Sequence, residues 1–142
     1  MLKRYTFWLT AAVLFQLVGG LMHSISFFVP LSGDTEAEKQ MVSLVTTLRL
    51  DLGAGFHPTF FNLFTALSSC MTFLFFFGAL TNGYLLWKHT ESDVMKGIIA
   101  INLLIFGLLF AVVGYLTFLV PIVCVGLVFV NLLAAFIFCG KE

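Results

Sequence analysis

The chain consists of long apolar stretches separated by short polar ones, and this pattern predicts membrane-spanning helices. A helix needs about 20 mostly apolar residues to cross the ~30 Å hydrocarbon core of a bilayer. Two such stretches cover about residues 5–29 and 59–87. A third, uncharged run from residue 97 to residue 140 is about twice the length of one span, so it has to fold back.

Pro121 marks the point at which the uncharged run turns back. Proline suits the first turn of a helix, because it has no N–H group to leave unpaired there. The third and fourth spans are therefore expected over about residues 97–117 and 121–139. Short connections favour neighbouring, antiparallel helices. The predicted fold is an all-α integral membrane protein, with residues 1–142 forming one transmembrane domain built as an antiparallel four-helix bundle.

A signal peptide is the alternative interpretation of the first stretch. Lys3 and Arg4 would form its basic start, and Ser24-Ile25-Ser26 a poor cleavage site. The apolar run continues past that site to Val29, which favours an uncleaved first span.

The longest polar segment is the first connecting loop, over about residues 31–57. Apolar residues recur in it at helical spacing: Met41, Leu44, Val45, Leu48 and Leu52. They predict a short amphipathic helix over about residues 35–52, with Thr35 and Glu38 at the spacing of a capping box. Its apolar face is expected on the outer end of the bundle or in the membrane interface. A lid over a cavity or a face for a partner is the alternative.

Basic residues predict the orientation in the membrane. Five of the seven lie at one side of the predicted bundle: Lys3, Arg4, Lys88, Lys96 and Lys141. Cytoplasmic loops carry an excess of Lys and Arg, so both termini are expected in the cytoplasm and residues 31–57 outside. Trp8 and Trp87 fall at the inner boundary, where indole rings prefer to lie.

Composition supports the membrane class and excludes others. Hydrophobic residues make up 61% of the 142 residues, and charged residues only 10%. Soluble domains carry roughly 25% charged residues. Disordered chains are poor in apolar residues, and seven basic residues balanced by seven acidic ones leave no excess for binding nucleic acid.

Polar residues within the spans form two groups. The outer-half group is centred on His23 and consists of Gln16, His23, Asn62, Thr65, Ser69 and Tyr115. One interpretation is a neutral His23 that hydrogen-bonds to hydroxyl groups and locks helix packing. The other is a site for a small ligand or a proton, because polar residues in membranes are often functional.

The inner-half group consists of Asn82, Asn102 and Asn131, which we expect to make interhelical hydrogen bonds. The third span also carries the small residues Gly107, Ala111 and Gly114, which would permit close helix approach within the bundle or between copies.

Neither a cofactor nor a metal ion is expected. A metal site needs several converging ligands, whereas His57 and His89 lie in loops and only His23 lies within a span. The three cysteines, Cys70, Cys124 and Cys139, lie in spans and form no C-x-x-C motif, which argues against a thiol oxidoreductase.

Three short segments resemble a family of small, uncharacterised bacterial membrane proteins with four predicted spans. They are Gly19–His23 in the first span, Phe60-Phe61 at the start of the second and Phe118–Val123 at the start of the fourth. The resemblance implies a bacterial inner-membrane location and supplies no activity.

Three hypotheses of function follow, and the first is favoured because no catalytic motif is recognisable. In the first hypothesis, the chain is an accessory or interaction component of the membrane, and its partners are the bilayer and a second copy or a membrane protein. Alternatively, it binds or converts a small lipophilic molecule, of lipid or quinone type, around His23. A transporter subunit acting as an oligomer ranks last, since no span carries a carboxylate to couple transport to protons.

Overall fold

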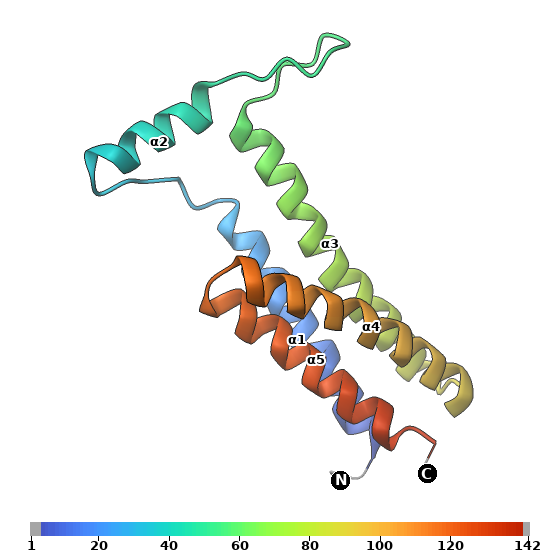
Figure 1. Ribbon diagram of the computed structural model, residues 1–142. Helices are drawn as coiled ribbons and strands as arrows, with labels where there is room; N and C mark the ends of the chain where they lie inside the picture. The colour runs from blue at the N-terminus through green and yellow to red at the C-terminus, as the bar shows by residue number, and fades with distance from the viewer. Residues whose placement is uncertain (1–3, 141–142) are drawn as a thin grey trace. The chain divides into compact units, whose positions relative to one another are not determined.

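A computed structural model describes residues 4–140 as an all-α protein (Figure 1). The helices follow one another as α1 (Tyr5–Ser26), α2 (Glu36–Thr47), α3 (Phe60–Trp87), α4 (Ser92–Leu116) and α5 (Leu119–Phe138). All except α2 are long and apolar enough to cross a membrane, which confirms the predicted fold class. Lys3 and Lys141, two of the residues that predict the orientation, lie outside the described residues.

Prolines lie at or near two of the helix ends. Helix α1 stops at Ser26, four residues before Pro30, and tighter turns follow over residues 27–29. Val29 itself precedes a proline, which disfavours helical dihedrals there. Helix α5 begins at Leu119, so Pro121 lies in its first turn, where an N–H group has no partner within the helix. Helix α4 begins at Ser92, five residues before the expected start of the third span at residue 97.

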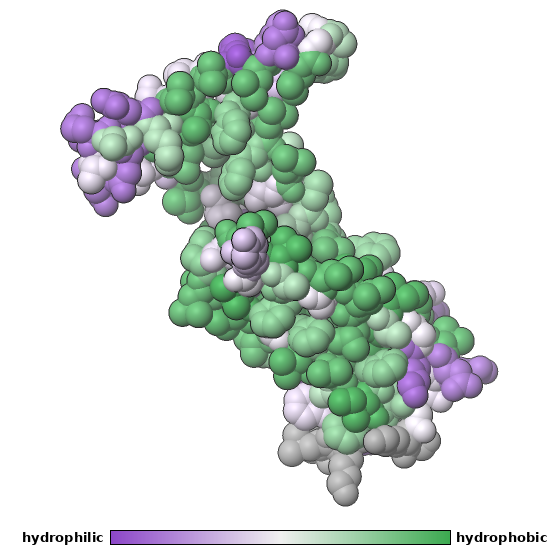
Figure 2. All heavy atoms as spheres, viewed as in Figure 1, coloured by the Kyte–Doolittle hydropathy of each residue, from purple (hydrophilic) through white to green (hydrophobic). Residues whose placement is uncertain are grey.

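The four long helices expose apolar side chains and bury polar ones. In each long helix, an apolar stretch of 18 residues is only 22–28% buried inside the protein. Phe77 is 68% exposed and Leu108 is 63% exposed, whereas Gln16 and Asn82 are fully buried. The visible surface of these helices is accordingly almost all hydrophobic (Figure 2). This distribution suits hydrocarbon, in which polar groups have to find partners inside the protein.

The chain divides into two compact units. The four-helix unit contains the residues up to Gly20 and from Leu74 onward, and so includes parts of α1 and α3 with all of α4 and α5. The α2 unit contains Leu21–Phe73, namely the last turns of α1, the connecting segment with α2, and the first half of α3.

Glycines and phenylalanines alternate across the α4–α5 contact in the four-helix unit. A Cβ atom on Gly107 would lie 3.1 Å from the ring of Phe129, and one on Gly126 would lie 3.1 Å from the ring of Phe110. The two rings stack with their centroids 5.8 Å apart. Each glycine therefore makes room for a ring of the opposite helix, so Gly107 serves packing within the bundle.

The amino-terminal end of α2 has the predicted capping box. The Glu38 N–H group donates to Thr35 Oγ1 at 3.2 Å, while the Glu38 carboxylate accepts from the N–H groups of Thr35 at 2.9 Å and Asp34 at 2.8 Å. The hydrogen bonds from the backbone of Thr35 and Asp34 lower the pKa of Glu38 below its usual value.

The carboxyl-terminal end of α2 differs from the prediction, because the helix stops at Thr47 and does not continue to Leu52. Residues 48–59 fold back on themselves instead, with Leu50 N–H donating to the carbonyl of Pro58 at 2.9 Å. At the tip, Gly53, Ala54 and Gly55 all have positive φ, and the Asp51 carboxylate accepts from Gly53 N–H at 2.9 Å. Because these residues favour a turn, the chain forms a turn here, although the spacing of Leu52 also fits a helix.

Candidate functional site

His23 joins α1 to α3 within the α2 unit. Its Nε2 atom donates to the backbone carbonyl of Ser68 at 3.0 Å and lies 3.1 Å from the Ser68 hydroxyl oxygen. A carbonyl oxygen only accepts, so this contact requires the proton on Nε2. The half-buried imidazole also contacts the ring of Phe27 edge to face, at 5.3 Å between centroids.

Among the described residues, no hydrogen bond joins the other predicted residues of the α2 unit to this imidazole. Ser69 donates its hydroxyl to the Ala66 carbonyl of its own helix at 2.7 Å, and Thr65 is half-buried. Asn62 is exposed near the start of α3. The hydrogen-bond partner of His23 is Ser68, which neighbours Ser69 in the sequence and is not one of the predicted residues.

Gln16 and Tyr115 belong to the four-helix unit. Gln16 is fully buried there and accepts a hydrogen bond from Asn82 Nδ2 at 3.4 Å. Gly78 leaves the space that the Gln16 amide fills, since a Cβ atom at this position would overlap with Gln16 Nε2. Tyr115 is 89% exposed. The structure thus pairs Gln16 with a member of the inner-half group, Asn82.

The three asparagines of the inner-half group are buried, but their hydrogen bonds differ from one another. Asn82 bonds to another helix, as expected. Asn102 donates to the Ile98 carbonyl at 3.0 Å and Asn131 to the Leu127 carbonyl at 2.7 Å, each four residues earlier in its own helix. Each of these two amides thus donates to its own helix, and their hydrogen bonding between helices stays a prediction.

Cations and aromatic rings meet where α3, α4 and α5 end or begin. Lys88 Nζ lies 5.0 Å from the centroid of the Trp87 ring and 5.8 Å from that of Tyr84, and Lys96 Nζ lies 5.4 Å from the ring of Phe136. Aromatic rings and lysines with apolar stems are typical of a membrane interface. This arrangement therefore suits one boundary of the bilayer.

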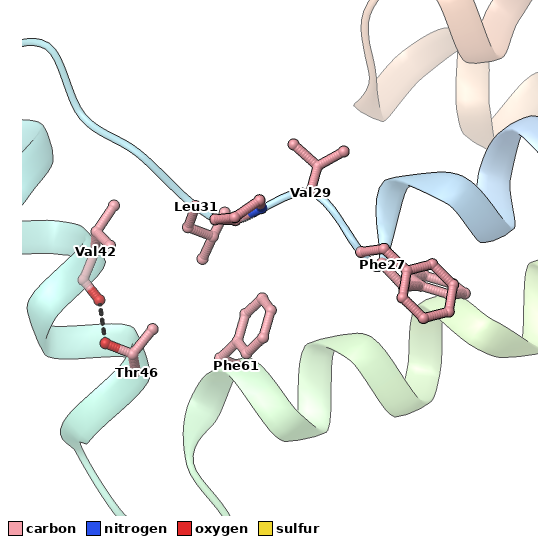
Figure 3. A pocket seen from close by; sticks show the side chains of 8 residues that line it. Phe27, Val29, Leu31, Val42, Thr46 and Phe61 are labelled. Atoms are coloured by element: carbon pink, nitrogen blue, oxygen red, sulfur yellow. Dashed lines mark hydrogen bonds between the residues drawn. The ribbon is translucent and has the colours of Figure 1, made fainter.

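The α2 unit contains an open cavity of about 210 Å³, which sequence reasoning missed (Figure 3). Its walls are Phe27, Phe28, Val29, Pro30, Leu31, Val42, Thr46 and Phe61. The Thr46 hydroxyl already donates to the Val42 carbonyl at 2.7 Å, so the walls offer chiefly hydrocarbon. Most of these lining residues belong to the connection that follows α1. From the sequence pattern, this connection was predicted only as the end of the first span.

No family model matches the chain, and neither a curated protein nor a solved structure matches it. The class is therefore given by the fold, whose four apolar helices fit a multi-pass membrane protein.

Proposed function

We propose that the chain is a non-enzymatic accessory or interaction component of the bacterial inner membrane, with both termini in the cytoplasm. The observation that carries this proposal is the use of polar side chains within the spans. His23 bonds to Ser68, and Gln16 bonds to Asn82, so these groups hold helices together. The resemblance of three segments to small bacterial four-span proteins supports the location.

General acid–base catalysis needs a proton carrier that faces a reacting group. His23 directs its Nε2–H group at a backbone carbonyl of the neighbouring helix, and this carbonyl has no proton to exchange. Interhelical hydrogen bonds of this kind contribute about 1 kcal/mol to stability in membranes. A packing role therefore accounts for the presence of a histidine in this span.

Helix α4 offers a surface for a partner helix. Gly107 is used against Phe129, but nothing lies within 4 Å of a Cβ atom placed on Gly114, and Ala111 is exposed one turn earlier. Small residues allow helices to approach closely in lipid, where van der Waals packing drives association. We propose that the surface around Ala111 and Gly114 contacts a second copy or another membrane protein.

Cross-linking in native membranes, followed by mass determination, tests this function. Wild-type protein should give a cross-linked complex, and Gly114→Leu should abolish it while the thermal unfolding temperature stays unchanged. Gly97→Leu is the matched control, because Gly97 also has nothing within 4 Å but lies near the other end of α4. An equally abundant complex in Gly114→Leu, or no complex in either protein, contradicts the proposed function.

The cavity favours a second candidate, the binding of a small lipophilic molecule. Ligand pockets are usually about 300–1,000 Å³, so a cavity of about 210 Å³ suits part of an alkyl chain. Native mass spectrometry of purified protein tests it: a retained lipid or quinone should disappear in Val42→Trp, which fills the cavity. Retention unchanged by this substitution, or no retained molecule, contradicts this candidate.

A further inference from the structure

Helix α2 presents an apolar face that is open to the surroundings. Met41, Leu44 and Leu48 are 58%, 57% and 47% exposed, and no residue of α2 is buried. Met41 and Leu44 lie three residues apart on one side of the helix, and Leu48 follows four residues later as the residue that caps its carboxyl end. Uncovered apolar residues in a row mark a surface that another apolar phase covers.

Another side of α2 is polar. Glu36, Lys39, Ser43 and Thr47 share it, and Lys39 Nζ forms an ion pair with Glu36 Oε1 at 2.8 Å. A helix with one apolar side and one charged side suits the plane of a membrane interface, where each side meets the solvent that it prefers.

The apolar surface continues in both directions along the chain. Phe28 is 84% exposed before α2, and Leu52 and Phe56 are 59% and 70% exposed at the tip of the hairpin after it. The segment is joined to α1 at Ser26 and to α3 at Phe60, two helices long and apolar enough to span the membrane. The hydrocarbon of the bilayer is therefore the apolar phase that these exposed side chains can reach.

The charges of the connecting segment indicate which force would hold α2 at a membrane. The connecting segment contains Asp34, Glu36, Glu38 and Asp51 but only Lys39 and Arg49 as basic residues. Anionic lipids attract clusters of Lys and Arg, which this segment lacks. Burial of the apolar side is then the driving force, and the lipid charge should matter little.

We propose that α2 lies in the plane of the membrane interface, with Met41, Leu44 and Leu48 among the acyl chains of the leaflet next to the carboxyl end of α1. The hairpin tip, with Leu52 and Phe56, enters the same interface. This inference does not depend on the proposed function, because it rests on α2 and the hairpin and not on α4.

Tryptophan fluorescence in vesicles of phosphatidylcholine with brominated acyl chains tests the inference. Leu44→Trp probes the apolar side, and Ser43→Trp is the matched control on the polar side of the same turn. The signal of Trp8 and Trp87 is measured in the unsubstituted chain and subtracted. Bromolipid should quench Leu44→Trp several-fold more than Ser43→Trp, and aqueous iodide should show the reverse. Replacing part of the lipid by phosphatidylglycerol should leave both signals unchanged.

Two results overturn the inference. If iodide quenches Leu44→Trp as well as Ser43→Trp, the apolar side faces water. If neither quencher reaches Leu44→Trp, protein covers this side instead of lipid. Met41→Trp repeats the measurement on the same side, so that misfolding of one variant, detected by circular dichroism, does not decide the outcome.

Discussion

The carboxamides of Gln16 on α1 and Asn82 on α3 meet in the fully buried part of the four-helix unit, where Asn82 Nδ2 donates to Gln16 Oε1 at 3.4 Å. The remaining polar atoms of the two amides, Gln16 Nε2 and Asn82 Oδ1, have no hydrogen-bond partner within the described chain. In hydrocarbon an unpaired polar group is costly, so each amide depends on the other.

This dependence predicts a non-additive pair of substitutions. Gln16→Leu and Asn82→Leu should each destabilise the protein, because each leaves a buried amide without its partner. The double variant should be more stable than the sum of the single effects predicts, with a coupling energy of about 1 kcal/mol. Unfolding in mixed detergent micelles measures the cycle, and strict additivity would show that the two amides do not interact.

Gly78 provides the space for the Gln16 amide, so adding a methyl group there should be harmful. Gly78→Ala should lower the free energy of unfolding by about 1–3 kcal/mol, the usual effect of overpacking. Gly97→Ala is the control, because nothing lies within 4 Å of its Cβ position, and it should be neutral or stabilising by up to about 1 kcal/mol. Equal unfolding temperatures for the two variants would contradict the close packing at Gly78.

His23 and Ser68 should contribute unequally to stability. His23→Ala removes the contacts with both the carbonyl and the hydroxyl of Ser68, and should cost about 1–2 kcal/mol. Ser68→Ala retains the carbonyl and should have a smaller effect. Thermal unfolding in detergent measures both. The contrary result would be a His23→Ala protein that is as stable as wild type but no longer retains a co-purifying molecule. This result would show that His23 serves ligand binding instead of packing.

The capping box of α2 should weaken in acid. The folded pKa of Glu38 is lowered by hydrogen bonds from the Thr35 and Asp34 backbone, so its stabilising effect is present above the unfolded pKa, about 4.3 for glutamate. This effect is lost as the pH falls through the lower folded value. Amide hydrogen exchange at residues 34–38 should accelerate over that range in wild type, after correction for intrinsic rates.

Glu38→Ala serves as the control for the acid effect, because Asp34, Glu36 and Asp51 are further carboxylates in the same region of the chain. This variant should already exchange fast at neutral pH and show little further change. A pH response that is the same in both proteins would assign the effect to the other carboxylates.

Local sequence signals were sufficient for the spans and for the start of α2. Span length, apolar composition, Pro121 and the Thr35–Glu38 spacing act within one or two turns of a helix, and the structure confirms the four apolar helices and the capping box. The predicted end of α2 near Leu52 was wrong, because the spacing of Leu52 fits a helix as well as it fits a hairpin. The turn residues from Gly53 to Gly55 decide between the two.

The pairing of polar residues was harder to predict, because it depends on how each helix is rotated and how deep it lies. Gln16 shares a helix face with His23 by spacing, yet it bonds to Asn82. The amides of Asn102 and Asn131 bond within their own helices, an option that a one-dimensional pattern does not distinguish from interhelical bonding. The cavity arises from an irregular connection and has no periodic signal at all.

If all four apolar helices cross the membrane, Lys39 in the first connecting segment and Lys88 after α3 lie on opposite sides, and cysteine labelling tests this most directly. In a background without the three native cysteines, Lys39→Cys should react with an impermeant maleimide in intact cells. Lys88→Cys should react only after the membrane is opened. Reaction of both in intact cells, or of neither, would contradict the four-span topology.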